Sequence, residues 1–142
     1  MDEQQIYDNI NWYQSRIDNN NNQIWNLRNR YEELEQIRLK LYESQSKLNE
    51  QRQNVRNKAG NIQCTFTKVR FMQLFSDVLK QSADDSYAIK AEEGICNSIE
   101  EVNQKMNSIL SEISSLESDN SYCSTMIDDY YYQLNTIQQE ED

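Results

Sequence analysis

Apolar residues recur at alternating intervals of four and three positions from residue 6 to residue 62. This spacing places them in two neighbouring rows on one face of an α-helix, as in the seam of a coiled coil. The first row, called d here, is Ile6, Tyr13, Asn20, Leu27, Leu34, Leu41, Leu48, Val55 and Ile62. The second row, called a, is Ile10, Ile17, Ile24, Tyr31, Arg38, Gln45, Arg52 and Ala59. The pattern predicts one long helix with a seam that weakens after Tyr31.

The four consecutive asparagines at residues 19–22 look like a loop when judged by composition. Asn is a poor helix former and a common turn residue. However, Ile17 before the run and Ile24 after it stand in the same phase of the pattern. A loop would have no reason to preserve that phase. We therefore predict a continuous helix through residues 19–22, with Asn20 in the seam.

The C-terminal part of the chain shows the same periodicity. Its d row is Ile95, Val102, Ile109, Leu116, Cys123, Tyr130 and Ile137. Its a row is Ile99, Met106, Ile113, Asn120, Ile127 and Leu134. Each long helix thus carries one asparagine among apolar seam residues, which suggests how the two helices align.

An antiparallel alignment that places Asn20 opposite Asn120 also places Leu27 opposite Ile113. A buried Asn pair fixes the register of a coiled coil at some cost in stability. An Asn facing an apolar residue would instead leave an amide unpaired, at a cost of about 1–3 kcal/mol. We therefore predict that Asn20 and Asn120 form a register-setting polar pair. The alternative is that both asparagines mark local breaks in the helices that are occupied by water.

The chain of 142 residues has no proline and only two glycines, which favours long helices over a sheet with tight turns. The sequence NKAGN around Gly60 contains the strongest helix-stop signal. We expect a single domain over residues 1–142, with helices at 4–60, 67–80 and 88–138. The predicted fold class is all-α: a long antiparallel helical hairpin, similar to a coiled coil, with a short third helix near the connection.

The predicted short helix has apolar residues on more than one face, including Phe71 and Phe75. The closed end of a hairpin cannot bury so much apolar surface by itself. Either this segment folds back along the coil as a third helix, or it contacts another protein.

Several large apolar residues fall outside the seam. Isolated aromatic residues on a protein surface are normal, but tryptophan is enriched in protein interfaces. The candidate residues for a partner interface are Trp12, Trp25, Leu39, Phe71, Phe75, Tyr122 and Tyr132.

The net charge of −10 argues against nucleic acid and anionic membrane surfaces as partners, because both require a basic surface. No apolar run approaches the roughly 20 residues that a membrane-spanning helix needs, so we expect no membrane insertion. The start of the chain, MDEQQIYDN, is acidic and unlike a signal peptide. The three cysteines follow no disulfide or metal-binding spacing, and reduced thiols in the cytoplasm are expected.

The sequence contains no histidine, which removes the commonest general base and the commonest metal ligand. Catalysis by a thiol–histidine pair or a Ser–His–Asp triad is therefore excluded. The neighbouring carboxylates in residues 84–101 could suggest a metal site, but acidic pairs on helices are usually a solvated face. We expect no enzymatic activity, no metal and no cofactor.

The layout of the chain resembles a known family of bacterial proteins. A long N-terminal helix, regular in Ile and Leu and rich in Asn, Gln and Ser, is followed by a short middle segment and then by ILSEISSLESDNSYCSTMIDDYYYQL. This resembles the small helical proteins encoded beside LXG toxins in the type VII secretion loci of Gram-positive bacteria. Two motifs are absent: KAGNIQ stands in place of Trp-x-Gly, and no Tyr-x-x-x-Asp/Glu lies near the C-terminus.

The resemblance implies a WXG-like helical hairpin that binds the helical LXG domain of a toxin by side-by-side helix packing. Such a protein would act as a chaperone or adaptor that targets the toxin. It would reside in the cytoplasm and could leave the cell with the toxin, by a route that needs no signal peptide. The alternative is a structural coiled-coil scaffold that self-associates as a homo-oligomer. Stoichiometry separates the two, because a scaffold would form a stable homo-oligomer while an adaptor would need a different chain.

Overall fold

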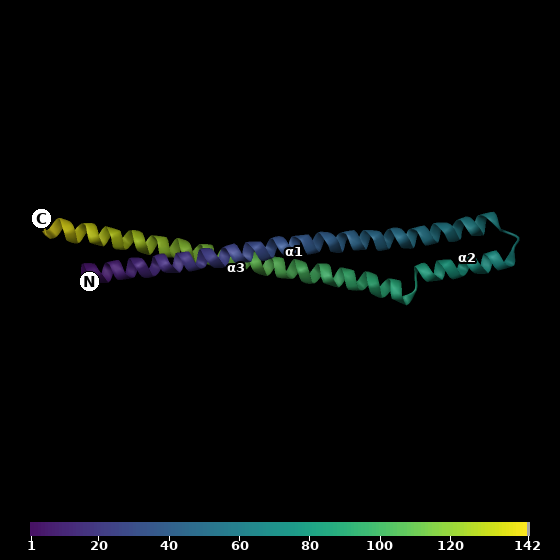
Figure 1. The fold of residues 1–142 in the computed structure, drawn as a ribbon, viewed down its shortest axis with the longest axis horizontal. Coiled ribbons are helices and arrows are strands. Elements are labelled where there is room, and N and C mark those ends of the chain that lie inside the picture. The colour runs from purple at the N-terminus through teal and green to yellow at the C-terminus, as the bar shows by residue number, and fades with distance from the viewer. Residues whose placement is uncertain (142) are drawn as a thin grey trace. The chain divides into compact units, whose positions relative to one another are not determined.

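The computed structural model describes residues 1–141, with side chains for residues 1–139, and contains three helices. Helix α1 spans Glu3–Thr65, α2 spans Arg70–Ala83 and α3 spans Ser86–Glu141. The prediction of an all-α helical hairpin with a short third helix is confirmed (Figure 1). None of the helices in the described chain combines the length and apolar character that spanning a bilayer requires.

Helix α1 begins with a reciprocal cap between Asp2 and Gln5. The backbone N–H of Gln5 donates to Asp2 Oδ1 at 2.8 Å, and the Asp2 N–H donates to Gln5 Oε1 at 3.2 Å. These bonds satisfy two of the donors that a helix start leaves open. The helix then continues through residues 19–22 without interruption, as the phase of the apolar pattern predicts.

Gly60 does not end α1, so the predicted boundary is wrong by five residues. A glycine stops a helix by adopting a positive φ angle, and neither glycine of the chain does so. The helix instead ends at Thr65, where the side chain of Gln73 caps it. Gln73 Nε2 donates to the carbonyl oxygens of Gln63, at 3.1 Å, and Phe66, at 2.7 Å.

The break between α2 and α3 is limited to Asp84 and Asp85. Helix α2 therefore starts and ends three residues later than predicted, and α3 starts two residues earlier. Asp85 caps α3, because its Oδ1 accepts the backbone N–H of Ala88 at 2.8 Å. A cap at this position explains why the helix resumes so soon after the break.

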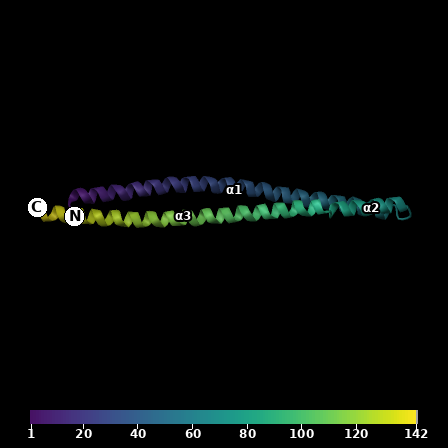
Figure 2. The same ribbon diagram turned by 90° about the horizontal axis from the view of Figure 1, so that it is seen from below.

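The contacts divide the chain into two units. The first unit comprises Met1–Glu33 and Lys105–Asp142, and the second comprises Leu34–Gln104. In the first unit, the start of α1 lies antiparallel beside the end of α3, as both views show (Figures 1 and 2). Its core consists of the seam residues of both helices, and the buried apolar ones are Ile6, Ile10, Ile24, Leu27, Met106, Ile109, Ile113, Cys123 and Leu134.

In the second unit, the later part of α1 packs against α2 and the start of α3. The residues buried here include three small ones, Ala59, Ser76 and Ala83, together with Ile99 and Val102. Ala59 and Ser76 let α1 and α2 approach closely, and Ser76 Oγ donates to the Ala59 carbonyl oxygen at 2.6 Å. This contact fixes which face of α2 is turned away from α1.

Candidate functional site

The structure brings Asn20 and Asn120 together within the first unit. Asn20 Nδ2 donates to Asn120 Oδ1 at 2.9 Å, and Asn120 Nδ2 donates to Asn21 Oδ1 at 2.9 Å. Asn20 is buried, with 6% of its surface exposed. Because its amide has polar partners inside the seam, burial leaves no donor unsatisfied. No water-filled break is needed to accommodate it.

Asp119 and Arg16 complete this polar cluster, and the sequence analysis did not identify them. Asn20 Nδ2 also donates to Asp119 Oδ2 at 2.7 Å. Arg16 binds the same carboxylate with both Nε, at 2.8 Å, and a terminal nitrogen, at 2.6 Å. Hydrogen bonds from Asn20 and then from Arg16 lower the pKa of Asp119 from its ordinary value of 3.8. Both residues hold position g of their heptads, but the predicted register does not place them opposite each other, so the sequence pattern did not pair them.

Trp12 and Tyr122 both pack against Tyr13, which is a seam residue. The Trp12 and Tyr13 ring centroids are 4.8 Å apart with planes at 84°, and those of Tyr13 and Tyr122 are 6.3 Å apart. The Arg16 guanidinium lies 5.4 Å from the centroid of the Trp12 ring. These two candidate interface residues therefore also support the fold, although each remains more than half exposed.

Trp25, Tyr132 and Leu39 are exposed candidates on the two long helices. Trp25 is 65% exposed and Tyr132 is 75% exposed. Among the described residues, neither ring stacks on another aromatic ring. Leu39, also exposed, belongs to the second unit, whereas Trp25 and Tyr132 belong to the first.

Helix α2 carries the most regular exposed apolar surface. Phe71, Leu74, Phe75 and Val78 stand at positions i, i+3, i+4 and i+7, so they form one stripe, and all four are exposed. The opposite face holds the buried Ser76 and Ala83. The α2 stripe, defined as these four exposed residues, therefore points away from the packed face of its own helix.

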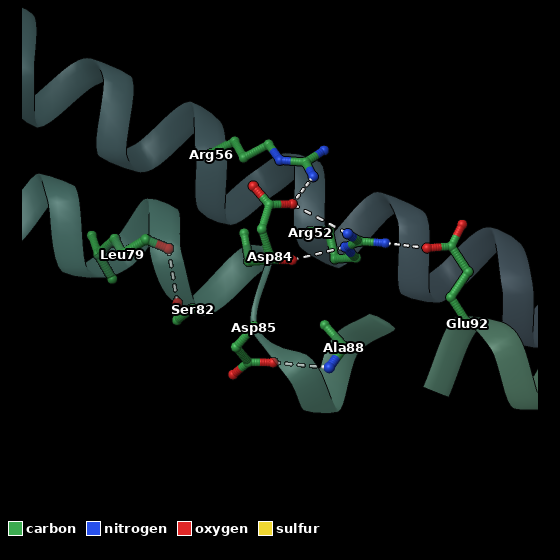
Figure 3. A network of polar contacts seen from close by, with 9 residues as sticks. Arg52, Arg56, Leu79, Ser82, Asp84, Asp85, Ala88 and Glu92 are labelled. Atoms are coloured by element: carbon green, nitrogen blue, oxygen red, sulfur yellow. Dashed lines mark hydrogen bonds and ion pairs between the residues drawn. The ribbon is translucent and has the colours of Figure 1, made fainter. Parts of the chain in front are cut away.

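A polar network holds α2 and the start of α3 on α1 (Figure 3). Arg52 Nε donates to the carbonyl oxygen of Ala83 at 2.8 Å, and its terminal nitrogens contact Asp84, at 3.2 Å, and Glu92. Arg56 also binds Asp84. The hydrogen bond from Arg56, followed by that from Arg52, lowers the pKa of Asp84. This network attaches the end of α2 to α1. The helix that carries the α2 stripe is therefore held in place by α1.

Sequence analysis identified Phe71 and Phe75 but did not single out Leu74 and Val78 as interface residues. The missing information was which face of α2 packs inward. A helix with apolar residues on several faces does not reveal this by periodicity alone. The position of the buried Ser76 decides it, and no pattern predicts that a serine lies at the packed centre.

The cysteines show no arrangement for thiol catalysis or metal binding within the described residues. All three are free thiols, and Cys123 is buried. Burial, and then the nearby Asp119 carboxylate, raises the pKa of Cys123, which disfavours the reactive thiolate. Within residues 1–139 no group of three Asp, Glu or Cys side chains is arranged to hold a metal ion.

No family model, curated protein or solved structure matches the chain.

Proposed function

We propose that this protein is a non-enzymatic binding partner for another helical protein. The observation that carries this proposal is the α2 stripe, a row of four exposed apolar side chains on a well-supported helix. Contiguous exposed apolar surface on a soluble protein commonly marks a site of interaction with another molecule. Its spacing of i, i+3, i+4 and i+7 is also that of helix-to-helix recognition.

The geometry of α2 favours a helix as the ligand. A single stripe on a 14-residue helix offers a surface one helix wide, which suits side-by-side packing. Phe71 is 72% exposed and Phe75 is 44% exposed, and aromatic side chains of this kind commonly dominate interface energies. We expect Phe71 to be the principal anchor.

The resemblance described for the sequence suggests the class of partner. We propose that it is the N-terminal helical domain of an LXG-type toxin secreted by a type VII system. In this role the protein would act as a chaperone or targeting adaptor, with helix packing as its only chemistry. Trp25 and Leu39 would then be secondary contacts outside the α2 stripe.

The test is coexpression of the tagged protein with the long helical polypeptide encoded beside its gene. We expect the two chains to copurify in a fixed ratio. Loss of an interface anchor costs about 2 kcal/mol or more, so Phe71→Ala should weaken binding by more than about tenfold. Tyr42→Ala is the matched control, because it removes an exposed aromatic residue outside the α2 stripe.

Loss of copurification by Phe71→Ala, with the Tyr42→Ala complex intact and circular dichroism unchanged, would support the α2 stripe as the binding site. Full binding by both variants would exclude the stripe. Absence of any copurifying chain with the unaltered protein would remove the adaptor role.

A further inference from the structure

The charge of the protein is divided unequally between its two units. The first unit contains four Lys and Arg residues and fourteen Asp and Glu residues, which account for the whole net charge of −10. The second unit contains ten of each and is neutral. The acidic first unit would attract any locally basic surface of the second unit of another copy.

The surroundings of the α2 stripe are the basic part of the second unit. Residues 58–83 contain Lys58, Lys68, Arg70 and Lys80 but only one acidic residue, Asp77. Lys68 and Arg70, at the start of α2, are exposed and make no ion pair among the described residues. The α2 stripe is therefore an apolar surface with a positive border at one end.

The end of α3 in the first unit offers the complementary surface. Tyr122 and Asp129 are seven residues apart, and Tyr132 follows Asp129 by three, so they share one side of the helix. Asp128, four residues before Tyr132, borders the same side. All four are exposed, and neither aspartate forms an ion pair in the described part of the chain. We call these four residues the Tyr–Asp face.

A shallow groove adjoins this face between the two ends of the first unit. It is lined by Met1, Ile6, Tyr132, Gln133, Thr136 and Ile137. Its lining is mainly apolar in character, and Tyr132 belongs to both the groove and the Tyr–Asp face. An aromatic side chain presented beside the aspartates would find an apolar recess there.

We propose that a second copy of this chain covers the α2 stripe, which docks on the Tyr–Asp face of that copy. Lys68 and Arg70 of one copy face Asp128 and Asp129 of the other, and Phe71 enters the groove beside Tyr132. Each copy has both surfaces, so each copy can offer its α2 stripe and accept that of another copy.

The test measures self-association of the full chain by sedimentation equilibrium. We expect a dimer whose dissociation constant rises with salt, since exposed charges are screened within about 3 Å at 1 M ionic strength. The double variants Lys68→Glu/Arg70→Glu and Asp128→Lys/Asp129→Lys should each weaken the dimer by about tenfold or more. Each variant alone places like charges against each other at this contact.

Mixing the two variants gives the decisive result. When the two variants bind each other, a reversed α2 border can meet reversed aspartates, and an unaltered α2 border can meet unaltered aspartates. Both contacts are then attractive, so the mixture should recover the affinity of the original protein. Lys40→Glu/Lys47→Glu is the control, because it makes the same change in net charge at exposed lysines away from α2.

Three results would overturn this dimer. The unaltered protein could remain a monomer at low salt, the control could weaken association as much as the α2 variant, or the mixture could fail to associate. Circular dichroism of each variant verifies folding. Because only this chain is present, the outcome is independent of copurification with a toxin. A partner that binds the α2 stripe would have to displace the second copy.

Discussion

The Asn20 side-chain nitrogen lies 2.9 Å from Asn120 Oδ1, joining two residues that are 100 positions apart in the sequence. The bond crosses between the two antiparallel helices of the first unit, at a point where all neighbouring seam layers are apolar or aromatic. One polar layer of this kind opposes sliding of the helices by a heptad, because any slip would place an amide against an apolar side chain.

Replacing both asparagines by leucine should stabilise the protein. A buried leucine contributes about 1.5–3 kcal/mol, whereas each lost hydrogen bond costs about 1 kcal/mol. Asp119 retains its two bonds to Arg16 in this variant. The midpoint of guanidinium unfolding should therefore rise for Asn20→Leu/Asn120→Leu and rise less, or fall, for either single change. A double variant less stable than both single variants would mean that the pair is a net source of stability.

The first unit should lose stability in acid through Asp119. Its pKa is lower in the folded protein than the ordinary value of 3.8, so its contribution is complete above about pH 4 and declines as the pH falls further. Asp119→Asn should thus melt at a lower temperature than the unaltered protein at pH 7. This difference should shrink between pH 4 and pH 3, as measured by thermal melting.

Asp18→Asn is the control for that measurement, because Asp18 is an exposed carboxylate that forms no ion pair within the described residues. A constant difference between the Asp119→Asn variant and the original protein at all pH values would show that charge is not responsible.

Alanine should be better than glycine at positions 60 and 94. Both glycines lie inside helices without a positive φ angle. Apart from the adjacent residues and the backbone of the same helix, no atom lies within 4 Å of the position a Cβ would take. Each substitution should add about 0.5–1 kcal/mol to the free energy of unfolding. A loss of stability for Gly60→Ala would indicate that α1 needs flexibility near its end.

Arg52 should matter more for stability than Arg56. Its side chain is 15% exposed and contacts Ala83, Asp84 and Glu92, whereas the Arg56 side chain is 40% exposed and contacts Asp84. Arg52→Met keeps much of the aliphatic length but leaves the Ala83 carbonyl oxygen without this donor. Its melting temperature should fall below that of Arg56→Met, and equal melting of the two variants would contradict the role of the Ala83 contact.

Trp12 and Trp25 should respond differently to truncation. Trp12 packs on Tyr13 and lies beneath Arg16, whereas Trp25 makes neither kind of contact with the side chains of residues 1–139. Thermal melting of Trp12→Ala should therefore be lower than that of Trp25→Ala, which should match the original protein. If Trp25→Ala also reduces copurification with a partner, Trp25 is a secondary contact in that interface.

The helix pairing of the first unit could be predicted from the sequence because its seam is almost entirely apolar. Ile17 and Ile24 preserve the heptad phase on both sides of the asparagines, so the periodicity outweighs the poor helix propensity of Asn. The ion pair between Arg16 and Asp119 involves residues beside the seam. The heptad pattern predicts which residues form the seam but not which side chains bind each other beside it.

The second unit was harder to predict because polar residues replace apolar ones in the a row of its α1 segment. Arg38, Gln45 and Arg52 stand in its a row, and heptad spacing does not reveal what they bind. Gly60 also carried a misleading signal, since a glycine ends a helix only where the chain turns there. The turn instead depends on Gln73, which binds the carbonyl oxygens of the last turn from the next helix.

The sequence separation of these contacts has a consequence for the order in which the chain folds. Ser76 and Ala59 are only 17 residues apart, so α1 and α2 can pack together while α3 is still being synthesised. Asn20 must wait for a residue 100 positions later, and the entropy of closing that loop is greater. Until then, the apolar seam at the start of α1 has no partner within its own chain. We expect this newly made segment to be the stretch most dependent on chaperones during translation.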